Sequence, residues 1–354
     1  MIVTLTANPS VDRTVTLTES LRRGQVHRAA SVTSHPGGKG VNVARVMSDS
    51  GAAVLAVLPG SDDDPVVHGL RTAGIEFRTV PVAGGPRVNL TIAETDGTTT
   101  KINEPGHPLK ARDLAELTAL LVESAAEAEW IVLSGSLPPG VPVGWYAQLV
   151  ATLSTPVSSS RTRRTRVAVD TSDAPLLALF DESAGAAPDL IKPNSEELAQ
   201  LTGLDPVDLD NPTAAADAAS TLIDRGVGAV LATLGAAGAV LVTADGAWFA
   251  AAPPIVPRST VGAGDSALAG YLLADLAGAS PADRLRTSVA YGSAATALPG
   301  TELPGPADVI LEAVTAHRLT ASEQDGIPPR PPPSQSTVTL TPGSRSHGFS
   351  TRPD

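Results

Sequence analysis

Short apolar runs alternate with longer segments of helical periodicity along most of the 354-residue chain. Seven runs rich in β-branched residues predict strands, at residues 2–5, 54–58, 130–133, 167–170, 190–192, 230–233 and 240–242. Because these runs are almost continuously apolar, they are typical of strands buried on both faces of a parallel sheet. Helical patterns separate them at residues 113–126, 142–153, 213–225, 267–277 and 281–297. This alternation predicts a layered α/β fold with right-handed crossovers.

A second pattern, alternation of apolar and polar residues, occurs at residues 14–17, 88–92 and 98–102. The last two segments are joined by Thr95-Asp96-Gly97, and Asp-Gly is a common turn of a β-hairpin. Antiparallel strands inserted early in an α/β chain suggest a small sheet over the main one. We therefore expect a lid with strands from about residues 12–34 and 86–104.

The chain becomes rich in Pro, Ser and Thr near residue 320. Residues 320–354 carry too few apolar side chains to offset the entropy of ordering, so we expect a disordered tail. A polyproline II ligand for a partner domain is the alternative. The polar, arginine-rich segment 154–166 is expected to be a solvated loop, with a basic interaction patch as its alternative. One folded domain is thus predicted over residues 1–319.

Composition and charge narrow the classes of function. The chain has no cysteine, which excludes disulfides, Cys-ligated metals and thiol catalysis. Its net charge of −12 argues against nucleic acid or an anionic membrane as a partner. The first residues do not read as a signal peptide and no long apolar run is present, so we expect a cytoplasmic protein without a membrane span. Any phosphorylated substrate would need local cations and backbone N–H groups.

The sequence TVGAGD at residues 260–265 leads directly into a helical pattern. Glycines before a helix let backbone N–H groups face an anion, and the helix dipole adds to the attraction. A carboxylate here would repel a bound phosphate unless it has a chemical task. Asp265 is placed to act as a general base on a hydroxyl that attacks a phosphoryl group. The alternative is that Asp265 only caps the helix.

Two further motifs have the composition of phosphate or metal sites. PGGKG at residues 36–40 places Lys39 in a glycine-rich turn before a helix, without the spacing of a Walker A motif. Alone, such a turn is more often structural. In KPNSEE at residues 192–197, Asn194 and Glu197 offer two oxygen ligands on one helix face, which suits Mg²⁺. A capping box formed by the same two residues fits as well, and both can hold at once.

Three other polar motifs follow predicted strands, at residues 8–12, 134–140 and 233–235, and Arg87 opens the predicted hairpin. The carboxyl ends of strands in open α/β sheets form the ligand-binding edge. We therefore expect one site to be assembled there.

These motifs together resemble the PfkB branch of the ribokinase-like family, closest to 1-phosphofructokinases and tagatose-6-phosphate kinases. The resemblance covers residues 1–319 and rests mainly on GGKGVNVAR and TVGAGD. It implies a Rossmann-type three-layer α/β/α core with a β-sheet lid. It also implies ATP and Mg²⁺ as cofactors, a sugar phosphate as substrate, and a homodimer formed through the lid.

The resemblance also implies roles for individual residues, with Asp265 as the catalytic base. Gly262, Ala263 and Gly264 would turn N–H groups toward the transferred phosphoryl group. Asp12, Gly38 and Asn42 would bind sugar hydroxyls, and Lys39 and Arg87 would bind the phosphate already on the sugar, with Arg28 as a weaker candidate. Lys192, Asn194, Thr233, Gly235 and Ser293 would contact ATP, and Asn194 and Glu197 would hold Mg²⁺ through water.

The GGKG form resembles 1-phosphofructokinases and tagatose-6-phosphate kinases more than 6-phosphofructokinases of this family, and we expect fructose 1-phosphate as the substrate. Tagatose-6-phosphate kinase and 6-phosphofructokinase activities are the alternatives within the family. A non-catalytic sensor of sugar phosphate or ATP is the alternative from another class, but Asp265 and its glycine loop are intact. An NAD-binding Rossmann protein is disfavoured because no G-x-G-x-x-G follows the first predicted strand.

Overall fold

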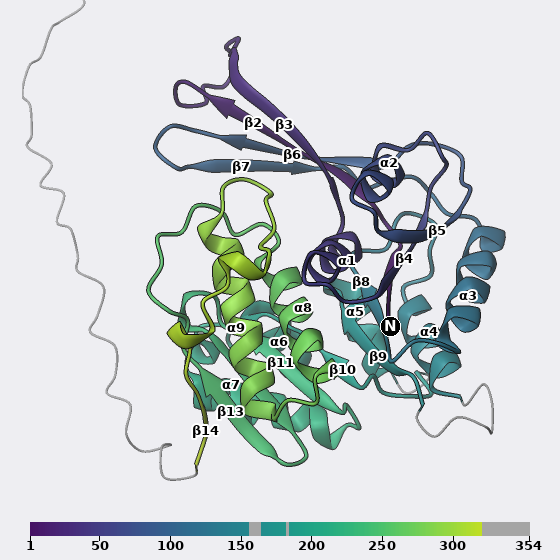
Figure 1. Cartoon of the computed structure of the whole chain (residues 1–354), viewed down its shortest axis with the longest axis vertical. Helices are drawn as coiled ribbons and strands as arrows, with labels where there is room; N and C mark the ends of the chain where they lie inside the picture. The colour runs from purple at the N-terminus through teal and green to yellow at the C-terminus, as the bar shows by residue number, and fades with distance from the viewer. Residues whose placement is uncertain (156–163, 182–183, 321–354) are drawn as a thin grey trace, which may run out of the picture. The chain divides into compact units, whose positions relative to one another are not determined.

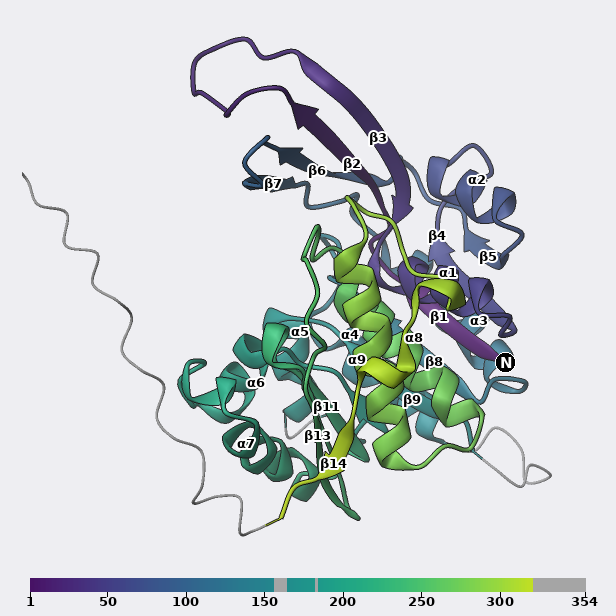
Figure 2. The same cartoon turned by 60° about the vertical axis from the view of Figure 1, so that its left-hand side comes forward.

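The computed structural model describes residues 1–155, 164–181 and 184–320, and contacts divide the chain into the units Met1–Leu319 and Thr320–Asp354. Within the described part of the first unit, ten strands form one sheet in the order β14-β13-β12-β11-β10-β9-β8-β1-β4-β5 (Figures 1 and 2). The strands are β1 (Ile2–Thr6), β4 (Val54–Pro59), β5 (Glu76–Val80), β8 (Trp130–Ser134), β9 (Arg166–Asp170), β10 (Leu190–Ile191), β11 (Ala229–Thr233), β12 (Ala239–Thr243), β13 (Gly246–Ala250) and β14 (Ala316–Arg318).

All seven predicted strands belong to this sheet, and six of them pair in parallel. The expectation that residues 240–242 form a parallel strand is wrong, because β12 runs antiparallel to β11. Only residues 234–238 separate the two strands, whereas a parallel crossover needs a dozen residues or more. Strands β5, β13 and β14 were not predicted. The two edge strands, β5 and β14, lack the apolar run that marks a central strand, and the apolar residues 247–250 of β13 were overlooked.

Helices cover both faces of the sheet, which confirms the predicted three-layer α/β/α core. Alternate residues of β1 show the division: Val3 and Leu5 pack into one apolar core and Ile2 into the other. The first core is covered by α3 (Ala111–Ala125), α4 (Trp145–Ser154), α5 (Asp173–Leu177), α6 (Ser195–Thr202) and α7 (Pro212–Asp224). The second is covered by α1 (Lys39–Asp49), α2 (Pro65–Thr72), α8 (Ala263–Leu276) and α9 (Pro281–Ala297).

The predicted small sheet is present and shares no strand with the main one (Figure 1). It consists, in the order β3-β2-β6-β7, of β2 (Ser10–Leu17), β3 (Ala29–Gly37), β6 (Arg87–Ala93) and β7 (Thr99–Asn103). The β6–β7 hairpin turns where Asp-Gly predicted it, with Gly97 at φ 89°. The sheet is not wholly antiparallel as expected, because β2 and β6 pair in parallel.

Helix α8 is the most enclosed helix near the predicted site. Residues 265–272 are all buried, whereas every residue of β6 in the lid is only half-buried. Near its C-terminal end, the buried Asp275 carboxylate accepts a hydrogen bond from Trp130 Nε1 at 2.8 Å. It also forms ion pairs with Arg166 and, at 3.0 Å, with Arg284. This cluster ties α8 to the start of the central strands and to α9.

Two predicted segments, the arginine-rich loop and the Pro-rich tail, fall largely on residues 156–163 and 321–354, which lie outside the described residues. Among the helices of the described ranges, none combines the length and the apolar character needed to cross a membrane.

Candidate active site

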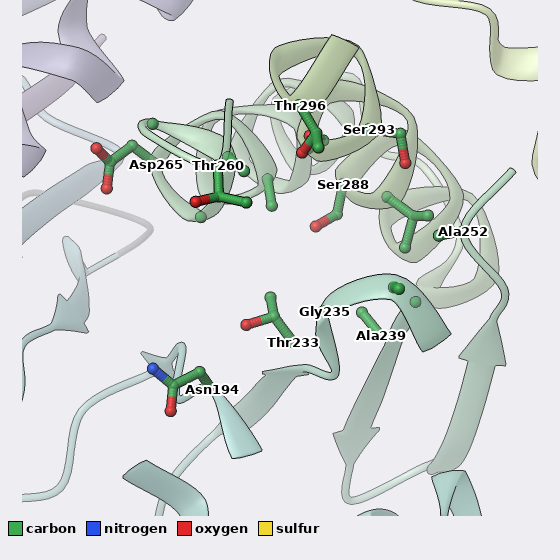
Figure 3. A pocket seen from close by; sticks show the side chains of 18 of the residues that line it. Asn194, Thr233, Gly235, Ala239, Ala252, Thr260, Asp265, Ser288, Ser293 and Thr296 are labelled. Atoms are coloured by element: carbon green, nitrogen blue, oxygen red, sulfur yellow. The ribbon is translucent and has the colours of Figure 1, made fainter. Parts of the chain in front are cut away.

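A cavity of about 1070 Å³ opens beyond the carboxyl ends of β10 and β11 and against the N-terminal turn of α8 (Figure 3). Many of the predicted site residues line it: Lys39, Lys192, Asn194, Glu197, Thr233, Gly235, Gly262, Ala263, Gly264, Asp265 and Ser293. The structure thus brings together segments that are more than 250 residues apart in the sequence. The predicted position at the carboxyl edge of the sheet agrees with this arrangement.

The cavity is polar at one end and largely apolar at the other. In Figure 3, Asp265 and Asn194 lie at one end, while Ser293 and Ala252 lie at the other. Thr233 lies between them, and its neighbour Gly235 lies toward the Ser293 end. The apolar end is lined by residues from β12, α9 and the proline-rich segment before α8: Ala239, Ala252, Pro253, Pro254, Ile255, Val289 and Gly292. An elongated ligand with a charged end and an apolar ring fits this division.

The first turn of α8 places Asp265 inside the cavity rather than at the helix cap. The N-cap is Gly262, whose φ of 75° favours glycine, so the alternative that Asp265 caps the helix is wrong. Asp265 Oδ2 accepts a hydrogen bond from Asn42 Nδ2 on α1 at 2.8 Å. A Cβ atom on Gly264 would lie 3.1 Å from Lys192 Nζ, so glycine allows the ammonium to approach this turn closely.

The pKa of the Asp265 carboxyl is raised to about 6. Burial is the main cause, because it penalises the charged carboxylate, and the negative charge of Asp170 adds to it. Lys39, Lys192 and the Asn42 hydrogen bond act in the opposite direction. A carboxylate with a pKa near neutrality is well matched to proton transfer at physiological pH.

Two lysines of the cavity share one carboxylate that sequence reasoning missed. Asp170, at the end of β9, is fully buried, and its Oδ1 accepts a hydrogen bond from Lys39 Nζ at 2.8 Å. Its Oδ2 lies 3.3 Å from Lys192 Nζ. Burial alone would raise the pKa of Asp170, but the two lysines hold it below its usual value. The only sequence signal was that VAVDTS ends a buried strand with a carboxylate.

Asn194 and Glu197 form the predicted capping box at the start of α6. Asn194 Oδ1 accepts from the Glu197 N–H at 2.8 Å, and Glu197 Oε2 accepts from the Asn194 N–H at 2.9 Å. Both side chains line the cavity and keep oxygen lone pairs that these bonds do not use. Among the described residues, no group of three or more His, Asp or Glu side chains could hold a metal ion. The pair therefore fits Mg²⁺ that keeps its waters, rather than a closed protein cage.

The lid contributes a separate polar cluster around Asp12 on β2. Its Oδ1 accepts from Ser10 Oγ at 2.8 Å and from Asn89 Nδ2 on β6 at 2.9 Å. A Cβ atom on Gly37 would lie 2.3 Å from Asp12 Oδ2, so only glycine permits this approach. Asn89 was not predicted, although it lies in the RVNLTI segment, and its buried Oδ1 has no hydrogen-bond partner among the described residues.

The structure does not bring Lys39 and Arg87 into one cavity. Arg87 lines a second cavity of about 440 Å³ together with Asn8 and Ser136. Its guanidinium donates to the carbonyl oxygens of Asn8 and Glu104, each at 3.3 Å, which leaves other N–H groups available. Gly38, at φ 104°, caps α1, and Arg28 is exposed and lines neither cavity.

Comparison with known proteins gives one family and several enzymes. The model of the pfkB family carbohydrate kinases matches residues 5–308. A 1-phosphofructokinase of Xanthomonas campestris is 38% identical over 77% of this chain and 83% of its own length. A 1-phosphofructokinase of Haloferax volcanii is 36% identical over 88% of this chain and 95% of its own length. Among solved structures, phosphofructokinase-2 from Escherichia coli in complex with substrates and products matches with a TM-score of 0.77 and 31% identity, covering 87% of this chain and 96% of that one.

Proposed function

Because the chain belongs to the pfkB family of carbohydrate kinases, we propose that it transfers the γ-phosphoryl group of ATP to fructose 1-phosphate. The product would be fructose 1,6-bisphosphate. The observation that carries the reaction class is the buried Asp265 carboxylate, with its raised pKa, on a glycine-rich helix N-terminus beside two lysines. The choice of substrate rests on the relatives named 1-phosphofructokinase.

Asp265 would act as the general base. It would take the proton of the free sugar hydroxyl as that oxygen bonds to the γ-phosphorus of ATP. The bond between the γ-phosphorus and the β–γ bridging oxygen would break, releasing ADP. The backbone N–H groups of residues 262–264 and the α8 dipole would stabilise the charge on the transferred group.

The remaining cavity residues divide between the two substrates. The apolar end with Ser293, Thr233 and Gly235 would take the nucleoside of ATP, and Lys192 would face its phosphates. Mg²⁺, bound through water by Asn194 and Glu197, would neutralise part of the phosphate charge. On the sugar side, Asp12, Gly38 and Asn42 would bind hydroxyls.

The separate cavities change the proposed role of Lys39. Its ammonium lies beside Asp170 and Lys192 in the cavity of Asp265, so we assign it to the transferred phosphoryl group. Arg87 then remains as the cation for the phosphate already on the sugar, with Ser136 near it. Through these cations an acidic protein would bind two anionic substrates, because they concentrate positive charge in the two cavities.

A homodimer through the lid also remains a proposal. Val32 on β3 and Ile102 on β7 are more than half exposed, and they lie on the two edge strands of the lid. Exposed apolar side chains on sheet edges favour pairing with another chain. The cytoplasmic location likewise stays a prediction from the sequence.

The substrate is tested by ATP turnover on fructose 1-phosphate, fructose 6-phosphate, tagatose 6-phosphate and unphosphorylated fructose. We expect kcat/KM to be at least about tenfold higher for fructose 1-phosphate than for the others, as one charged contact in a different position suffices for that factor. Fructose 6-phosphate is the main competitor because a 6-phosphofructokinase isozyme of Escherichia coli is 32% identical to this chain. A preference for it would replace the proposed substrate, and no turnover on any sugar would favour the sensor.

The pH profile tests the base. Only the ionised form of Asp265 can accept a proton, and its pKa is about 6. Turnover should therefore be lost as the pH falls through about 6, reaching roughly a tenth of the plateau one pH unit below the pKa. The measurement is kcat/KM between pH 5 and 8 at saturating ATP. A profile that stays flat down to pH 5 would contradict the assignment.

A further inference from the structure

Asp170 is a buried carboxylate in contact with two cations from different elements. Lys39 is the first residue of α1, and Lys192 follows β10, yet both ammonium groups reach the same side chain at 2.8 and 3.3 Å. The carboxylate itself is fully buried. Apart from the ion pair with Lys192, its Oδ2 has no hydrogen-bond partner among the described residues. Asp170 therefore fixes the separation of two charges that belong to the active-site cavity.

Burying such a cluster is not an efficient way to stabilise a fold. The desolvation of buried ions often cancels their attraction, so apolar residues of similar volume would serve stability equally well. The side chains of Asp170, Lys39 and Lys192 together carry a net charge of +1. The Lys192 ammonium lies close to the turn at Gly264. The position of the cluster, rather than its contribution to stability, points to a role in the reaction.

The proposed base is a competing partner for the lysines. The negative charges of Asp170 and Asp265 both act on Lys39, that of Asp170 more strongly, and Glu197 adds a weaker effect. A lysine side chain is a flexible stem with a point charge, so an unrestrained ammonium would move toward the remaining carboxylate. A direct ion pair would lower the basicity of Asp265 and hold the lysine away from the phosphoryl group.

We propose that Asp170 is a positioning residue, which holds Lys39 and Lys192 beside the transferred phosphoryl group and keeps both ammonium groups from pairing with Asp265. The inference rests on the proposed function, because it needs a phosphoryl group in this cavity. It does not depend on which sugar accepts that group.

The test is Asp170→Asn, which keeps the shape of the side chain and removes its charge. We expect kcat to fall about ten- to a hundredfold, since charged contacts are loosened at the transferred group. The affinity for ATP, measured by calorimetry without any sugar, should change less than kcat, because the more positive cavity offsets the displacement of the lysines from the phosphates. A loss of ATP affinity as large as the loss of kcat would indicate general damage to the site and overturn the proposal.

The pH profile gives a readout that a purely structural role would not move. The groups facing Asp265 are Asp170, Lys39, Lys192 and Asn42. Removing the negative charge of Asp170 lowers the pKa of Asp265, and so does the approach of a released lysine. The acidic limb of kcat/KM should therefore shift to lower pH in Asp170→Asn. The proposal would be overturned if the acidic limb of kcat/KM stayed at the pH of the parent, or if the variant kept more than about half of the parent kcat.

Asp275→Asn is the matched control. Asp275 is also a buried carboxylate shared by two cations, but it lies near the C-terminal end of α8, away from the cavity. Its loss should lower the melting temperature while the folded fraction keeps the parent kcat and pH profile. If Asp275→Asn lowered kcat and shifted the pH profile as Asp170→Asn does, both effects would come from the packing of α8 and the proposal would fail.

The parent enzyme separates this inference from the proposed substrate. If the sugar panel identifies an acceptor other than fructose 1-phosphate, the substrate proposal is wrong and the Asp170 variants are assayed on that acceptor. If no sugar is phosphorylated, both proposals fail, and calorimetry still shows whether the cavity binds ATP.

Discussion

Replacing Asp265 with asparagine is expected to lower kcat by about 10²- to 10⁴-fold, the range found for loss of a general base. The amide has nearly the same volume and can still accept the hydrogen bond from Asn42, so α8 should keep its place. The affinity for ATP should remain near that of the parent, because the substitution leaves the backbone N–H groups of residues 262–264 unchanged. Steady-state kinetics, calorimetry and a melting curve measure the three quantities.

A matched control for this variant is Asp283→Asn. Asp283 also lies in the first turn of a helix, where its carboxylate accepts a hydrogen bond from Ser280 Oγ at 2.7 Å, but it is outside the cavity. Its substitution should leave kcat unchanged. If Asp265→Asn retained more than about a tenth of the parent rate, Asp265 would not be the base.

Replacing Arg87 with alanine is expected to raise KM for the sugar phosphate about ten- to a hundredfold. The loss of a charge-assisted contact to a phosphate costs roughly 1.5–3 kcal/mol, which corresponds to that factor. KM for ATP should change little, because Arg87 lines a cavity separate from that of Lys192 and Asp265. Fructose without a phosphate should be a poor substrate, and equally poor for parent and variant.

Arg78→Ala provides the control for a lost arginine. Arg78 lies on β5 and pairs with Glu123 at 3.1 Å on an exposed surface, so both KM values should stay at the parent level. Lys39→Ala is tested by the same comparison of KM for the sugar phosphate with KM for ATP. A rise confined to the sugar phosphate would return Lys39 to the role that the sequence suggested. A fall in kcat would agree with its place beside Asp170.

The main sheet and the lid hairpin could be predicted because their signals are local. Buried central strands have continuous apolar runs, and the Asp96-Gly97 pair marks the β6–β7 turn. The direction of β12 was missed, although the short connection after Thr233 already excluded a parallel crossover. The parallel pairing of β2 with β6 had no local signal, since about seventy residues separate the two strands.

Residues of the site that lie in glycine-rich turns were found from the sequence, and their partners were not. Gly262 and Gly264 indicated an anion-binding turn, and the structure places this turn in the cavity. Asp170 meets Lys39 across 131 positions of sequence, and Asn89 meets Asp12 across 77. A buried carboxylate at the end of a strand looks the same in the sequence whether it binds two lysines or none. The assignment of Lys39 to the sugar phosphate lacked the same information, because the sequence did not show the contact of Lys39 with Asp170.

The contrast between α8 and the lid has a consequence for how such an enzyme can diverge. Residues 265–272 of α8 are all buried, so most changes of volume there disturb packing at a cost of typically 1–3 kcal/mol. Apart from the buried Gly37, the residues of β3, β6 and β7 are half-buried or exposed, and substitutions there disturb packing little, although Arg87 has a proposed role of its own. New acceptor preferences can therefore accumulate through substitutions on the lid, while α8, which carries the proposed base, tolerates fewer changes. Libraries that seek altered sugar specificity are best confined to the lid strands.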